Sequence, residues 1–304
     1  PIGALTQGLE GKRLSGMYSL KQAGCVALSQ ANQPIQNAMN MKNALEYAVG
    51  QNLVVMLRCE DTLLRNNGVA HSGPVSSRLG LVANPVSSET SALARDLILV
   101  EEAGIRAHFS QLSSARSIEM IADAKKRGLP VTCDVAIHQF HLTEMDLLGF
   151  NSLFNVSPPF RSMQDKNALQ MGLKSGVIDA VVSDHTPLEK DDKLLPFGES
   201  KPGISGLETL LPLLLKLVNE YGLDLMTAVR SVTQGPAEIL GLNIGNLDIG
   251  NSADFSVIDP NATWTLESDS MISEGKNSPF IGWEFTGQVE HTYFQGRPVY
   301  RNNQ

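Results

Sequence analysis

An acid and a histidine follow directly on a short apolar run, where the stretch VVSDH ends on Asp184 and His185 and a proline then turns the chain. An apolar strand that ends in this way presents its last residues at the carboxyl end of a parallel sheet, where barrel enzymes place their working groups. Asp184 is therefore a candidate metal ligand or general base. The alternative interpretation is a solvated carboxylate at a strand end.

The histidines do not show the spacing of a ligand pair on one strand. No two are separated by a single residue, and the six are His71, His108, His138, His141, His185 and His291. His138 and His141 are three residues apart, which could place both on one helical face. They directly follow a predicted strand, however, so we favour structural or hydrogen-bonding roles for them. His185 is expected to point away from its neighbour Asp184.

Short apolar runs alternate with amphipathic stretches through the first 242 residues. The predicted strands are Ile2–Leu5, Cys25–Leu28, Leu53–Leu57, Ile105–Phe109, Pro130–Val135 and Ile178–Val182. Helical periodicity covers 88–103 and 115–127, and a glycine stands between each of these helices and the next strand. Such repeats predict an α/β fold with a parallel sheet, either open or part of an incomplete (β/α)8 TIM-type barrel.

The sequence pattern changes after Leu242. Glycines there separate short β-type runs, namely Asp254–Ile258, Thr263–Leu266, Gln288–Phe294 and Pro298–Tyr300. We predict a barrel over residues 1–242 and a β-rich appendage over 243–304. No low-complexity linker joins them, so the appendage is expected to pack on the barrel.

Composition excludes several classes of function. The formal net charge is −8, which argues against nucleic acid or an anionic membrane as a partner. No apolar run approaches the ~18 residues of a membrane span. Cys25, Cys59 and Cys133 are an odd number without CxxC spacing, so buried free thiols and a reducing, cytoplasmic setting are expected.

Several longer stretches resemble bacterial class I dihydroorotases, which belong to the amidohydrolase superfamily of metal-dependent (β/α)8 barrels. They include SARSIEMIADAKKRGLPVTCDV, SPPFR, PFGESKPGISGLETLLPLLL and GKNSPFIGWEFTGQV. The resemblance runs in order along essentially the whole chain. It is greatest to the non-catalytic dihydroorotase homologues that assemble with aspartate transcarbamoylase.

The resemblance implies a defined set of ligands in active members. Those enzymes use one or two zinc ions to activate a water for the interconversion of carbamoyl aspartate and dihydroorotate. The ligands are an HxH after the first strand, a bridging carboxylate after the fourth, histidines after the fifth and sixth, and an aspartate after the eighth. The first two strands, with the HxH, are expected to precede Pro1, so that the chain begins like a cut into something longer.

Most of the ligand positions that the chain does contain have changed. Alignment by eye places Gln30 at the bridging carboxylate, Arg58 and Gln111 at the two histidines, and Asp184 at the aspartate. A guanidinium cannot lose its proton to bind a metal. We therefore expect Arg58 to repel zinc and to form a charge pair with Asp184, which would make Asp184 a relic of the catalytic base.

Two substrate positions have changed as well. Ser157 replaces the first residue of the family's Asn-Pro-Pro, and Leu188 replaces a histidine four residues beyond the aspartate. A leucine cannot hydrogen-bond a substrate that carries carboxylates.

Three functions remain open at this point. The first is a non-catalytic scaffold in pyrimidine biosynthesis, with no cofactor, that forms an oligomer with the catalytic chain of aspartate transcarbamoylase. The second is an active zinc-dependent dihydroorotase that uses the unseen HxH together with Asp184. The third is a binding module that holds a small anion through Arg58.

Overall fold

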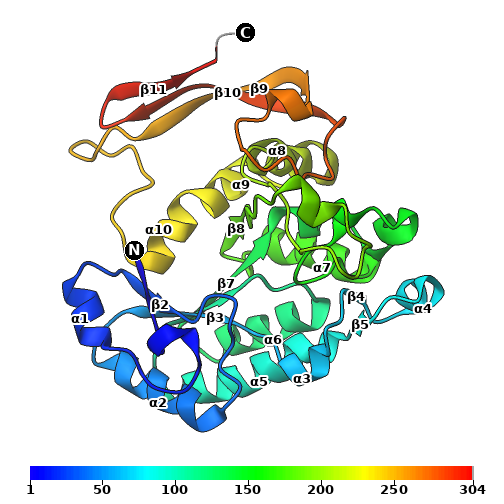
Figure 1. Cartoon of the computed structure of the whole chain (residues 1–304). Helices are drawn as coiled ribbons and strands as arrows, with labels where there is room; N and C mark the ends of the chain where they lie inside the picture. The colour runs from blue at the N-terminus through cyan, green and yellow to red at the C-terminus, as the bar shows by residue number, and fades with distance from the viewer. Residues whose placement is uncertain (303–304) are drawn as a thin grey trace.

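The structure is a computed structural model that describes residues 1–302. Its centre is a six-stranded sheet in the order β1-β2-β3-β6-β7-β8, and every neighbouring pair is parallel (Figure 1). The strands are β1 (Ile2–Ala4), β2 (Ala27–Ser29), β3 (Val54–Arg58), β6 (Ala107–Ser110), β7 (Val131–Ala136) and β8 (Ala180–Val182). All six strands predicted from the apolar runs are confirmed.

The strands carry apolar residues on both faces because helices cover one side and the barrel core fills the other. Val55 pairs with Ala107, and Ala107 in turn pairs with Val131. All three side chains are buried, as is Phe109. Since the strands are parallel, their carboxyl ends meet at one edge of the sheet.

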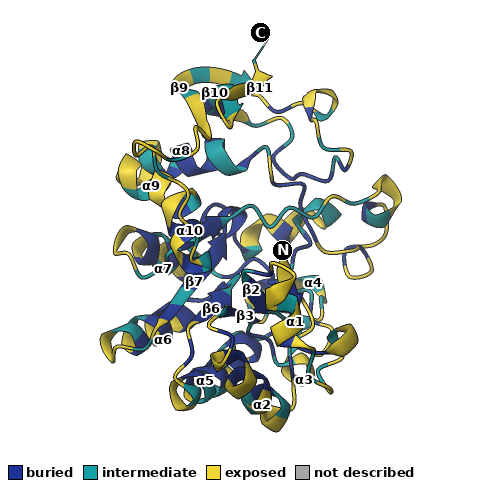
Figure 2. Ribbon diagram, turned by 90° about the vertical axis from the view of Figure 1, so that its left-hand side faces the viewer, coloured by how far each residue is buried: buried dark blue, intermediate teal, exposed yellow. Residues whose placement is uncertain are grey.

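Helices connect the strands and lie on the outer side of the sheet, where Figure 2 shows buried inner faces and exposed outer faces. They are α1 (Met17–Gln22), α2 (Ala38–Val49), α3 (Thr62–Arg65), α4 (Pro74–Leu79), α5 (Val86–Ala103), α6 (Ala115–Lys126), α7 (Met163–Lys174), α8 (Leu210–Tyr221), α9 (Leu225–Val232) and α10 (Gln234–Leu240). In α6 the side chain of Ser114 caps the first turn, and Ile118 and Ile121 face the core. A two-stranded parallel ladder, β4 (Ala70–His71) and β5 (Ala83–Asn84), flanks α4.

The C-terminal part is a three-stranded antiparallel sheet that contacts α8. Its strands are β9 (Phe255–Thr265), β10 (Glu284–Phe294) and β11 (Arg297–Arg301). The two runs predicted at 254–258 and 263–266 were wrong as separate strands, because β9 continues through Pro260. A shift in register opposite Gly287 absorbs the proline, which has no N–H to donate to the ladder.

The segment between β9 and β10 returns to the barrel. Leu266 and Phe280 are 1% and 0% exposed and belong to the same hydrophobic core as the barrel strands, and the backbone N–H of Ile272 donates to the Glu208 carboxylate over 3.0 Å. The appendage is thus joined to the barrel at two places, through α8 and through this segment.

Two further expectations can be compared with the structure. The three cysteines are buried and form no disulfide within residues 1–302. None of the helices in the described part of the chain has both the length and the apolar character needed to span a bilayer.

Candidate functional site

The candidate site lies at the carboxyl ends of the parallel strands. Arg58 is the last residue of β3, Gln111 directly follows β6, and Asp184 lies two residues beyond β8. Ala31, Gln111 and Asp184 all have left-handed backbones, with φ of 51°, 56° and 47°. Such strained conformations in residues other than glycine are typical of functional sites. The left-handed backbones thus single out three positions that closely follow parallel strands.

Hydrogen bonds join four of the predicted site residues. Arg58 donates from Nη1 to Oε1 of Gln111 and from Nη2 to Oγ of Ser157, the latter over 3.0 Å. Gln111 in turn donates from Nε2 to Oδ1 of Asp184. Arg58 also contacts Oδ1 of Asn32 at 3.3 Å. Three of the four positions compared with the metal ligands of the resembled family are thus linked to one another, through an arginine and an amide.

The expected charge pair between Arg58 and Asp184 was wrong in its geometry. Gln111 lies between the two, and the ion pairs within 4 Å in residues 1–302 do not include them. An amide has both an acceptor and a donor, so it can satisfy the guanidinium and the carboxylate together. The backbone N–H of Gln111 donates to Oδ1 of Asp134 over 2.7 Å, and this hydrogen bond fixes the backbone of Gln111.

Burial dominates the electrostatics of Asp184. It raises the pKa of this carboxyl to about 6, against the opposing effects of the Arg58 charge and the Gln111 hydrogen bond, while the charge of Asp134 adds to the increase. Arg58 therefore offsets only part of the cost of placing a carboxylate here.

Gln30 and Leu188, two other predicted positions, are not joined to this network. The Gln30 side chain is buried and exchanges hydrogen bonds of 2.8 and 2.9 Å with the hydroxyl of Thr6. The backbone N–H of Leu188 donates to Oδ1 of Asn277 over 2.9 Å. His185 is also engaged elsewhere, because its Nδ1 accepts from the backbone of Leu207 at 3.3 Å.

Asn277, which sequence reasoning missed, ties together both ends of the loop after β8. Its Nδ2 donates to the carbonyls of Thr186 and Gly203 over 2.9 and 3.0 Å, in addition to the contact with Leu188. We call these contacts the Asn277 clamp. Nearby, a Cβ at Gly275 would lie 2.6 Å from the Cβ of Pro187, so the backbone there leaves no room for a side chain.

Lys193 anchors the charged segment 189–193 in the loop after β8. Its side chain is buried and donates to the carbonyls of Ser152 and Asn155 over 3.0 and 3.1 Å. Burial lowers the pKa of its amine to about 8. Asn155 also donates to the carbonyl of Ser200 over 2.8 Å, so the loop is held at two points.

A buried carboxylate network supports the neighbouring connection after β6. Glu89 accepts hydrogen bonds from the backbone N–H groups of Ser113 and Ser114 over 3.1 to 3.2 Å and from the Ser117 hydroxyl. The guanidinium of Arg161 lies 3.9 Å away and donates to Oγ of Ser113 over 3.0 Å. No sequence motif had singled out Glu89, and Arg161 appeared only as the last residue of the SPPFR stretch, without a role.

His138 and His141 both follow β7 and are buried. Nε2 of His141 hydrogen-bonds the carbonyl of Leu213 at 3.0 Å, whereas neither ring nitrogen of His138 contacts a partner in residues 1–302. Burial lowers the pKa of each imidazole to about 3. The His138 ring instead meets Phe160 edge-on, with centroids 5.6 Å apart.

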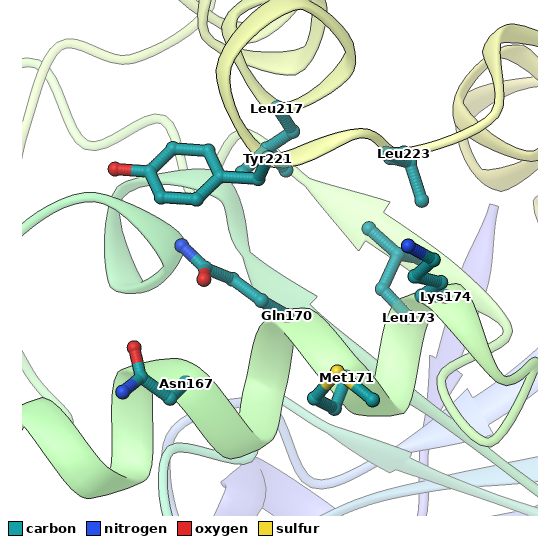
Figure 3. Close-up of a pocket in the computed structure, with 8 residues that line it drawn as sticks. All are labelled: Asn167, Gln170, Met171, Leu173, Lys174, Leu217, Tyr221 and Leu223. Atoms are coloured by element: carbon teal, nitrogen blue, oxygen red, sulfur yellow. The ribbon is translucent and has the colours of Figure 1, made fainter.

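A cavity of about 170 Å³ opens at the hydrogen-bonded residues. It is lined by Asn32, Arg58, Glu60, Arg65, Ser157, Asp184, Thr186, Pro202 and Gly203. A separate hollow of about 240 Å³ lies between α7 and α8, where Figure 3 shows Gln170 and Tyr221 on opposite walls. None of the predicted site residues lines that second hollow.

The donor set at the candidate site does not fit zinc. Ligation needs neutral imidazole, thiolate or carboxylate groups. Asp184 is the one such group at the four compared positions, and Arg58 places a permanent cation beside it. No group of three or more histidine, cysteine, aspartate or glutamate side chains within residues 1–302 could hold a metal ion.

The fold and the position of this site define an amidohydrolase of the TIM-barrel type, and comparison with known proteins shows the same. The "Amidohydrolase family" model matches residues 69–299, and the chain belongs to that family. The L-hydantoinase (dihydropyrimidinase) of Arthrobacter aurescens superposes with a TM-score of 0.88 at 25% identity, over 100% of this chain and 70% of that one.

Within that family the chain is a dihydroorotase-like protein. The "Dihydro-orotase-like" model matches residues 1–117. A dihydroorotase-like protein of Pseudomonas aeruginosa is 47% identical over 97% of this chain and 70% of its own length. A dihydroorotase of Geobacter metallireducens is 43% identical over 99% of this chain and 71% of its own length. The resemblance to the dihydroorotase family that was read from the sequence is confirmed.

Proposed function

We propose that this protein is a non-catalytic dihydroorotase homologue of the cytoplasm that serves as a scaffold for aspartate transcarbamoylase. The non-catalytic part of this proposal is supported by the series of hydrogen bonds from Arg58 through Gln111 to Asp184. Three compared positions are involved, and two of them hold an arginine and an amide, which hydrogen-bond each other, and the amide also donates to one oxygen of the remaining carboxylate. Zinc forms no part of this proposal.

The names of similar proteins also support this proposal. Two relatives from Pseudomonas named dihydroorotase-like protein are 47% and 46% identical to the chain. The compared relatives named dihydroorotase are 40% to 43% identical. The partner, the catalytic chain of aspartate transcarbamoylase, comes from the resemblance alone. The intact core and the clamped loops are consistent with a barrel that is kept for its surface.

The first experiment measures zinc content and dihydroorotate hydrolysis on the same zinc-supplemented sample of the full-length protein. We expect no stoichiometric zinc and no turnover. Stoichiometric zinc with turnover that a chelator abolishes would establish the active dihydroorotase instead.

The second experiment tests the partner. The full-length protein is co-expressed with the catalytic chain of aspartate transcarbamoylase, and the two are examined by size-exclusion chromatography with light scattering. We expect a complex of defined stoichiometry. Separate elution of both proteins at micromolar concentration would contradict the scaffold role.

A further inference from the structure

The cavity at the candidate site combines two guanidinium groups, two hydroxyls and two carboxylates. Arg58, Arg65, Ser157 and Thr186 line it, and so do Glu60, which pairs with Arg65, and Asp184, which accepts from Gln111. Its volume of about 170 Å³ is smaller than the ~300–1,000 Å³ of pockets for drug-sized ligands. Any ligand that it takes is therefore small.

Arg58 lacks an anionic partner. Its hydrogen bonds go to Asn32, Gln111 and Ser157, all of which are neutral. The group is half-buried, and no carboxylate in residues 1–302 pairs with it within 4 Å. A guanidinium in such a setting is stabilised most by an ionised oxygen acceptor, because charge-assisted hydrogen bonds are the stronger ones.

Arg65 gives a second, independent observation. Its Nη1 pairs with Oε2 of Glu60 at 3.2 Å, while its Nε is buried and has no hydrogen-bond partner in the described part of the chain. Arg65 also lines the cavity, so its guanidinium places a second positive charge close to that of Arg58.

We propose that this cavity binds a small oxyanion between Arg58 and Arg65. The planar guanidinium groups recognise two oxygens at once, which suits a phosphate, a bicarbonate or a short carboxylate. Ser157, whose oxygen accepts from Arg58, adds a hydroxyl donor at the same cavity. The site goes beyond the scaffold role and does not rest on it, since it needs neither a metal nor a partner chain.

The test is titration of inorganic phosphate into the protein at constant ionic strength, read by calorimetry and by the shift in Tm. We expect saturable binding and a Tm that rises with ligand concentration. Arg58→Met and Arg65→Met should each weaken binding by at least about tenfold. Arg116→Met is the matched control, because Arg116 is exposed on α6 and pairs with Glu119. It should bind phosphate as the parent does.

Bicarbonate and acetate are titrated in the same way to separate the sources of the oxyanion. Tighter binding of phosphate assigns the site to a phosphoryl group, and tighter binding of acetate assigns it to a carboxylate. No saturable binding of any of the three would overturn the proposal, as would full binding by a folded Arg58→Met variant. If that variant does not fold, Arg58→Lys keeps the charge but loses the planar fork, and unweakened binding by it would be equally contradictory.

Discussion

The side-chain amide of Gln111 donates a hydrogen bond to the Asp184 carboxylate, and both residues have left-handed backbones. The two lie at the ends of β6 and β8, and β7 separates those strands in the sheet. The resemblance to dihydroorotases implies that the equivalent positions share an ion in metal-dependent members of the family. Here the Gln111 amide joins the ends of the two strands in place of an ion. The properties of the site therefore depend on the ionisation and the hydrogen bonds of individual side chains.

Asp184→Asn should stabilise the protein above pH 6. The pKa of Asp184 is raised from 3.8 to about 6, so the folded protein binds its proton more tightly than the unfolded chain does. Its contribution to stability therefore falls as the pH rises from about 4 to about 6 and stays low above that. An asparagine can still accept from Gln111. We expect a gain of about 2 kcal/mol at pH 8 and little change at pH 4, measured by urea unfolding.

Asp123→Asn is the control for that measurement, because Asp123 is exposed on α6 and pairs only with Lys126 at 3.6 Å. Its stability should change by less than ~0.5 kcal/mol at both pH values. A loss of stability in Asp184→Asn at pH 8, together with a loss of bound metal, would show that Asp184 is a ligand after all.

His138→Leu should reduce the sensitivity of the fold to acid. The pKa of His138 is lowered from 6.5 to about 3, so its stabilising contribution is complete above pH 6.5 and is lost as the pH falls toward 3. Between these two pKa values, each such group changes the free energy of unfolding by up to about 1.4 kcal/mol per pH unit. The leucine removes one of these contributions and should not destabilise the protein at pH 7.5, because neither ring nitrogen has a partner in residues 1–302.

His141→Leu should reduce the pH dependence of the unfolding free energy by a similar amount, since the pKa of His141 is also about 3. This variant also loses the hydrogen bond to the Leu213 carbonyl. We expect it to lose about 1 kcal/mol at pH 7.5, a cost that His138→Leu avoids. Unfolding free energies at pH 4.5 and 7.5 separate the two variants, and an unchanged pH dependence in His138→Leu would refute the assignment of a neutral, buried imidazole.

Glu89→Ala should be severely destabilising. It leaves the buried guanidinium of Arg161 without its carboxylate and removes acceptors from three serines. Breaking a buried pair on one side typically costs about 3–5 kcal/mol. Thermal and urea unfolding test this against Glu102→Ala, whose carboxylate is exposed and pairs with Lys42, and which should lie within about 0.5 kcal/mol of the parent. Equal effects would mean that the network is not formed.

Ala31→Gly should stabilise the protein by about 0.5–1 kcal/mol. Ala31 is exposed and holds a φ of 51°, a conformation that costs other residues more than it costs glycine. Ala94→Gly in the middle of α5 is the comparison and should lose about 1 kcal/mol. Urea unfolding at pH 7.5 measures both. A loss in Ala31→Gly would place the left-handed backbone at this position in doubt.

The sheet and part of the site could be predicted from the sequence for a physical reason. Apolar runs followed by polar residues identify both a buried strand and its carboxyl end, so Arg58, Gln111 and Asp184 could be placed at one edge before any coordinates. The side-chain directions could not. The Gln30 side chain hydrogen-bonds Thr6, and the Gln111 side chain lies between Arg58 and Asp184. Neither side-chain direction can be predicted from residue spacing or periodicity.

Long-range partners were missed for a related reason. Asn277 contacts Leu188 across 89 positions of sequence, and Glu89 meets Ser113 across 24. Such contacts depend on how loops close over a finished sheet. Local patterns carry no information on that step, and the likeness to dihydroorotases identified the GKNSPF segment without giving it a role.

The Asn277 clamp also has a mechanical consequence. The segment that carries it is anchored by Leu266 and Phe280 and runs directly into β9 and β10. The C-terminal sheet and the rim of the cavity are therefore connected through one continuous segment that hydrogen-bonds Thr186 and Gly203. A displacement of that sheet is expected to reach the cavity through these two residues.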